Sequence, residues 1–203
     1  MKTTIIASLA ALTLAFSVTG CLEDKVLEVV VKGETYADFK ENHTSASWTN
    51  PVVIDFAAEV RQILEDNGYS LSDIKDARLV GASYGVTKFS HVHDWIIEGA
   101  ITVARQDISA GPFTIVDYSD QSVAGALGKK IPAELNEDGV TLINKALSDL
   151  LAGADPVLVF TVENGTVGPD PPKLEDPIVF DWRAWITFHI VVEQTVENVP
   201  DPF

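Results

Sequence analysis

The chain has 203 residues, of which 30 are acidic and 14 are basic, and its formal net charge is −16. We do not expect so acidic a protein to bind nucleic acid. An acidic surface repels phosphate backbones and anionic lipid headgroups alike. With one cysteine the chain cannot close a disulfide within itself, so its stability must come from packing. The length and the hydrophobic content are enough for one compact core, and we expect a single domain.

The first twenty residues have the layout of a secretory signal peptide. Lys2 supplies a positive start, residues 5–16 form a mostly apolar run, and small or branched residues lead to Cys21. The apolar run is shorter than the roughly 20 residues that a membrane-spanning helix needs. The stretch Val18-Thr19-Gly20-Cys21 resembles the lipobox of bacterial lipoproteins, with Val18 in place of the commoner Leu.

The resemblance to bacterial lipoproteins covers residues 1–21 and implies cleavage after Gly20 and a diacylglycerol on the Cys21 thiol. It also implies a place in the cell envelope, and because Leu22 rather than Asp follows the cysteine, the outer membrane is favoured for a Gram-negative cell. Residues 21–25 then form the lipidated end and a tether of about 13 Å at full extension. We expect no cofactor besides this lipid. The alternative, an ordinary thiol beside an ordinary signal peptide, needs a separate cleavage site.

At the start of the mature chain the sequence predicts a strand followed by a helix. Residues 26–39 alternate between apolar and polar, which predicts a strand with one buried face. Asn50-Pro51 offers a cap and a first-turn proline, and apolar residues then recur at helical spacing until Asn67-Gly68. This pattern predicts a helix over residues 51–66.

The middle of the chain predicts three strands, a second helix and a short buried strand. Residues 77–89 and 95–105 read as two strands, followed by a shorter one at 113–118. Asn136 can cap a helix that has an apolar stripe and ends at Gly153. The expected strand at 157–162 is almost wholly apolar and should be central in its sheet.

The last third predicts a loop, a long strand and a tail. Residues 164–177 have no period and contain several prolines and glycines, so we expect a long exposed loop. From 178 to 192 every even position is apolar, which predicts a strand with one core face. The domain should span 26–196, before a flexible tail at 197–203. Strand-rich order with two amphipathic helices favours a mainly β (α+β) fold, a β-sandwich of immunoglobulin-like outline.

His91, His93 and Asp94 are the candidate metal ligands. Two imidazoles two residues apart share one side of an extended segment and suit zinc or copper, but a site needs further ligands, for which His189 or Asp181 are candidates. Two solvated histidines between strands are the simpler interpretation. The acidic residues of the loop could bind calcium, but they lack the alternate spacing of a calcium loop, so a solvated loop is preferred. These residues are Asp170, Glu175, Asp176 and Asp181.

Two tryptophans are candidates for a ligand or partner face. Trp185 falls on the polar face of the last strand beside Arg183 and His189, where it could stack on a sugar, meet a protein, or be buried under a helix. Trp48 precedes the first expected helix and could either pack against that helix or serve as a ligand platform.

No catalytic motif is present: the sequence has no G-x-S-x-G, H-E-x-x-H or phosphate-binding glycine loop, and no second cysteine. The favoured function is therefore a non-enzymatic, lipid-anchored binding or structural module that contacts the membrane through its lipid and recognises a protein or glycan. A carbohydrate-binding module that uses exposed tryptophans is one alternative. A metal-binding protein or hydrolase centred on His91 and His93 is the other.

Overall fold

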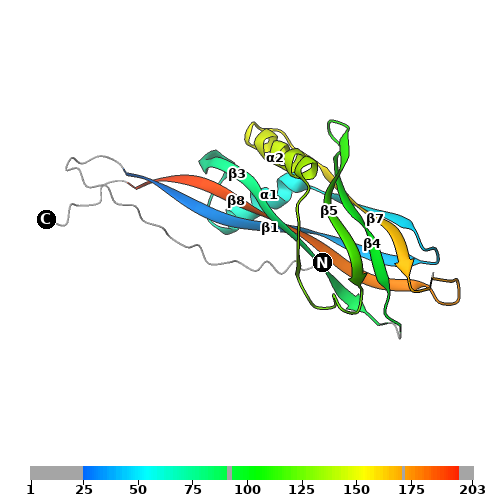
Figure 1. Cartoon of the computed structure of the whole chain (residues 1–203). Helices are drawn as coiled ribbons and strands as arrows, with labels where there is room; N and C mark the ends of the chain where they lie inside the picture. The colour runs from blue at the N-terminus through cyan, green and yellow to red at the C-terminus, as the bar shows by residue number, and fades with distance from the viewer. Residues whose placement is uncertain (1–24, 91–92, 171, 197–203) are drawn as a thin grey trace.

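The computed structural model describes residues 25–90, 93–170 and 172–196, which form two antiparallel four-stranded sheets and two α-helices (Figure 1). The prediction of a mainly β chain with two helices is confirmed, and the sheets form a sandwich-like pair. The leader, Gly20, Cys21, His91 and the C-terminal tail lie outside the described residues. Within the described part, no helix is both long and apolar enough to cross a bilayer.

The first sheet has the strand order β1-β8-β3-β6. It consists of β1 (Lys25–His43), β8 (Ile178–Val196), β3 (Ile74–Phe89) and β6 (Ile131–Ala133). The two outer segments of the chain, β1 and β8, pair along all 19 residues, with position 25 opposite position 196. At about 3.3 Å per residue this ribbon is about 60 Å long.

The second sheet has the order β2-β7-β4-β5. It consists of β2 (Trp48–Ile54), β7 (Leu158–Gly168), β4 (Ile96–Arg105) and β5 (Ala110–Ser122). The expected central position of the apolar strand that begins near residue 157 is confirmed, because β7 lies between β2 and β4.

The helices pack against the inner faces of the sheets. The first, α1 (Phe56–Asp66), places Phe56 edge-on against Phe188 of β8 at 5.9 Å between ring centroids. The second, α2 (Glu137–Leu151), begins at the predicted cap Asn136 and contacts β3, β4 and β5 (Figure 1). A short 3-10 turn, η1 (Leu71–Asp73), leads into β3.

The alternation of the last strand holds in the structure. Apart from Ala184, the even positions of β8 from 178 to 192 are buried, and Trp182 is 1% exposed, whereas the odd positions are half-buried or, at Val179, exposed. The inner faces of the two sheets meet at this strand, because the rings of Trp182 and Tyr118 of β5 are 5.3 Å apart.

Several elements differ from the sequence predictions. Residues 51–54 belong to β2 and not to the first helix, which starts at Phe56 with Asp55 as its cap, accepting a hydrogen bond from the Ala58 amide at 3.0 Å. Pro51 is tolerated in β2 because this strand lies at the edge of its sheet and needs no second set of amide donors. The expected loop at 164–177 begins later, since β7 continues to Gly168. The three-residue strand β6 was not predicted.

Candidate functional site

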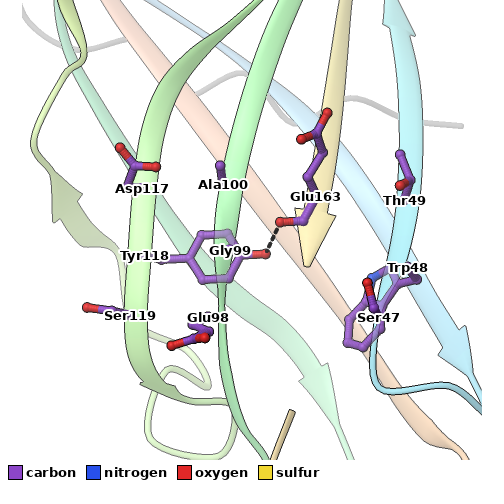
Figure 2. Close-up of a pocket in the computed structure, with 10 residues that line it drawn as sticks. All are labelled: Ser47, Trp48, Thr49, Glu98, Gly99, Ala100, Asp117, Tyr118, Ser119 and Glu163. Carbon is purple, nitrogen blue, oxygen red and sulfur yellow. Dashed lines mark hydrogen bonds between the residues drawn. The ribbon is translucent and has the colours of Figure 1, made fainter. Parts of the chain in front are cut away.

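A concave site with a volume of about 620 Å³ lies on the outer face of the second sheet. All four strands of the sheet contribute residues to it, and Ser47 lies just before the first of them, β2 (Figure 2). We call it the acidic groove. It is lined by Ser47, Trp48, Thr49, Glu98, Gly99, Ala100, Asp117, Tyr118, Ser119 and Glu163.

Small residues of β4 lie between the two sides of the acidic groove. Gly99 and Ala100 carry little or no side chain there, and the register of β4 with β7 shifts between Glu98 and Gly99. Asp117 projects from β5 on one side and Glu163 from β7 on the other (Figure 2). The absence of bulky side chains on the central strand is therefore what leaves the space open.

Three exposed carboxylates, on Glu98, Asp117 and Glu163, give the acidic groove its charge. No ion pair or side-chain hydrogen bond of these carboxylates is found in the described part of the chain, and none of the lining residues is basic. The groove therefore offers unpaired hydrogen-bond acceptors at a negative potential. It suits ligands with amine or hydroxyl donors and disfavours anions.

Two aromatic residues that line the acidic groove, Trp48 and Tyr118, have buried side chains. Tyr118 is buried, its hydroxyl donates to the backbone carbonyl of Glu163 at 3.4 Å, and burial raises the pKa of this phenol well above its ordinary value. Trp48 is 8% exposed, and its indole stacks on the imidazole of His43 at 4.4 Å. The buried Nε1–H of Trp48 finds no acceptor among the described residues.

A buried polar cluster supports Trp48 from behind. The carboxylate of Glu41 is buried and accepts hydrogen bonds from Trp182 Nε1 at 2.8 Å and Asn50 Nδ2 at 3.1 Å. His43 Nε2 lies 2.6 Å from the same carboxylate. Three partners compensate the cost of burying one charge. The cluster thus fixes the imidazole on which the Trp48 ring rests.

The candidate metal ligands lie at another place. Asp94 accepts hydrogen bonds from Ser122 Oγ at 2.6 Å and from the Ala124 amide at 2.8 Å, so its carboxylate holds the turn after β5. His93 and Asp94 line a depression of about 380 Å³ together with Asp170, Lys173, Glu175 and Asp176 of the acidic loop. Among the described residues no group of three or more histidine, cysteine or acidic side chains is arranged to hold a metal ion.

The remaining candidates lie on the outer face of the first sheet, away from Trp48. Arg183 stacks on Tyr36 at 3.7 Å and donates two hydrogen bonds to Asp38, of 2.6 and 2.8 Å, which raise the pKa of the guanidinium. Trp185 is half-buried, with Lys130 Nζ 4.9 Å from its ring.

His189 lies on the same face, four residues after Trp185. The two helices contact the opposite face of this sheet, so neither buries Trp185. The two candidate tryptophans therefore do not form one aromatic surface. Asp181 also lies on this face, opposite Lys40 and Lys88, and not in the depression beside His93.

The carboxylates of the acidic groove were not among the candidates from the sequence. Acidic residues at outward positions of strands are common on any solvated sheet, so their individual positions gave no signal. In the comparisons with known proteins, no family model and no curated protein matches this sequence.

Proposed function

We propose that the chain is a lipid-anchored cell-envelope protein and acts there as a non-enzymatic binding module whose ligand occupies the acidic groove. The observation that carries this proposal is the groove itself, a concave site with three exposed carboxylates that have no partner among the described residues. The immunoglobulin-like outline of the sandwich belongs to the same proposal and is supported by two facing antiparallel sheets.

The position of the acidic groove relative to the proposed anchor supports this function. Cys21 precedes the start of β1 by four residues, whereas Ser47 and Trp48 of the groove follow the other end of β1. Because β1 has 19 residues, the two ends are about 60 Å apart along the strand. A ligand can therefore reach the groove without competing with the lipid anchor for space.

The chemistry of the acidic groove selects a ligand rich in hydrogen-bond donors. Carboxylates bind the ammonium and guanidinium groups of a basic protein segment through charge-assisted hydrogen bonds. A protein partner with a basic or hydroxyl-rich segment is therefore our first candidate. A glycan is the second, because Trp48 and the hydroxyls of Ser47, Thr49 and Ser119 line the same site as the acceptors.

The test compares two probes on the purified protein by NMR chemical-shift mapping: a hexalysine peptide and a neutral β-1,4-linked oligosaccharide. The double variant Asp117→Asn, Glu163→Gln removes two groove charges, and we expect about two- to fivefold weaker binding of the peptide for each carboxylate lost. The control Glu65→Gln, Glu134→Gln removes two exposed carboxylates elsewhere and should leave binding unchanged. Equal binding by the groove variant and the control, or shifts that map away from the groove, would contradict the proposal.

A further inference from the structure

The basic side chains of this acidic chain are concentrated on the outer face of the first sheet. Seven of them lie there, as judged from the register of the strands, the buried residues that alternate with them and their side-chain contacts. They are Lys32, Lys40, Lys75, Arg78, Lys88, Lys130 and Arg183. The four strands of the second sheet contain one basic residue, Arg105, whose side chain is buried between Asp107 and Asp149. The two outer faces therefore differ strongly in charge.

The face is much less acidic than the chain as a whole. Six carboxylates share it, namely Glu28, Glu34, Asp38, Asp76, Asp181 and Glu193. Seven basic less six acidic groups give +1 for the face, whereas the whole sequence, a larger set of residues, carries −16. The repulsion of anionic lipid headgroups that the net charge of the whole chain implies is therefore not expected at this face.

One row of the face is made of basic residues alone. His189 of β8 is paired in register with Lys32 of β1 on one side and with Arg78 of β3 on the other. No ion pair of these three side chains is found in the described part of the chain. Lys32 and Arg78 thus place two positive charges on either side of His189, with no carboxylate in the same row, and their donors can meet an anion there.

Exposed apolar side chains lie beside the basic row, on the side of the chain's N-terminal end. Val30 is 45% exposed and opposite Val191, and Val26 is 57% exposed. On the other side of the row lie the rings of Tyr36 and Trp185, which are paired in register. Basic, aromatic and aliphatic side chains on one flat face are the combination found where a protein meets the headgroup region of a bilayer.

We propose that the outer face of the first sheet lies on the anionic surface of the bilayer that holds the Cys21 lipid. This inference rests on the lipid anchor of the proposed function. Lys25, the first residue of β1, is four residues from Cys21, and Lys32 is seven residues further, so the tether keeps the basic row within reach of the headgroups.

The acidic second sheet does not prevent this orientation. Packed sheets are about 10 Å apart, which exceeds the screening length of about 8 Å at physiological ionic strength, so the carboxylates of the acidic groove are largely screened from the bilayer. In this orientation the acidic groove, on the outer face of the opposite sheet, is directed away from the membrane.

The orientation can be measured with the acylated protein on vesicles. The variants Thr187→Cys, on the outer face of the first sheet, and Thr161→Cys, on the outer face of the second, are each labelled with a thiol-reactive fluorophore. Cys21 is alkylated in the acylated protein and does not react. Quenching by headgroup spin-labelled lipid is compared in phosphatidylcholine vesicles with and without a minority of phosphatidylglycerol.

We expect strong quenching at position 187 and weak quenching at 161, with a difference that grows when phosphatidylglycerol is present. Each basic residue at an anionic surface changes the population of the docked state about fivefold, so Lys32→Gln with Arg78→Gln should largely remove the difference. The control Lys145→Gln with Lys173→Gln removes two basic residues outside the face and should preserve it.

Co-sedimentation of the same samples separates the two proposals. Vesicle-bound protein with equal quenching at both positions, or with no dependence on phosphatidylglycerol, overturns the docking of this face and leaves the anchor intact. Protein that is not acylated and does not sediment with vesicles overturns the anchor and the docking together.

Discussion

Replacing Trp182 with Ala should be among the most destabilising single changes in this protein. The side chain is 1% exposed, and four aromatic rings surround it at centroid distances between 5.3 and 6.4 Å. These are the rings of Phe39, Tyr84, Tyr118 and Phe180. Truncating a buried tryptophan to alanine costs about 3 to 5 kcal/mol through lost burial and the cavity left behind. The variant also deprives the buried carboxylate of Glu41 of one donor, so we expect the upper part of that range.

The measurement is urea unfolding at 25 °C followed by far-UV circular dichroism, because the change removes a fluorophore. A double-mutant cycle of Trp182→Phe with Glu41→Leu isolates the hydrogen bond between the two side chains. We expect a coupling free energy of about 1.5 to 3 kcal/mol, as for hydrogen bonds to charged groups. A loss below about 0.5 kcal/mol for Trp182→Ala is typical of a surface position and would refute the assigned inner face of β8.

Three further predictions concern stability. Gly85→Ala places a Cβ 1.9 Å from a neighbouring backbone carbonyl oxygen and should cost about 1 to 3 kcal/mol in urea unfolding, whereas Gly81→Ala on the same strand meets nothing within 4 Å and should cost less than about 0.5 kcal/mol. Hydrogen bonds from Arg105 lower the pKa of Asp107 below the ordinary 3.8, so the stability that this carboxylate contributes is present above that pH and lost as the pH falls through the lowered value. Asp107→Asn should therefore flatten the decline of the unfolding free energy between about pH 5 and pH 2, and an unchanged slope would count against the ion pair. Asn136→Ala removes the α2 cap and should lower the free energy of unfolding by about 1 kcal/mol, measured by urea unfolding. An unchanged free energy of unfolding would show that the cap does not stabilise α2.

Elements with a long local period could be predicted from the sequence. The alternation from 178 to 192 specifies β8 and its buried face without knowledge of any partner strand, because a one-residue slip would expose the whole apolar set. The cap at Asn136 is equally local, since the side chain satisfies an amide two residues later. These features depend on neighbours within a few residues, which the sequence displays directly.

The prediction of a helix start at Pro51 is wrong because a helix and an edge strand share this sequence signal. Proline suits the first turn of a helix, where its missing N–H is not needed, and it also suits an edge strand for the same reason. Asn50 completed the resemblance to a helix cap, but its side chain instead donates to the buried Glu41. Only the pairing of β2 with β7, which lies about a hundred residues later in the chain, decides between the two.

The acidic groove could not be predicted because its residues come from distant parts of the chain. Trp48, Glu98, Asp117 and Glu163 meet only through the order β2-β7-β4-β5, and no local pattern specifies that order. The basic row of the first sheet has the same origin, since Lys32 and Arg78 become neighbours only through the strand between them. The sequence shows which types of side chain are present, whereas the pairing of the strands determines which of them become neighbours.

The covalent state of Cys21 decides both the proposed location of the module and the face proposed to meet the membrane. Intact-mass and peptide mass spectrometry of the protein isolated from its native membranes measures this directly. We predict a mature chain that begins at Cys21 and carries a thioether-linked diacylglycerol. A free Cys21 thiol, or a mature N-terminus at any other residue, would contradict the account.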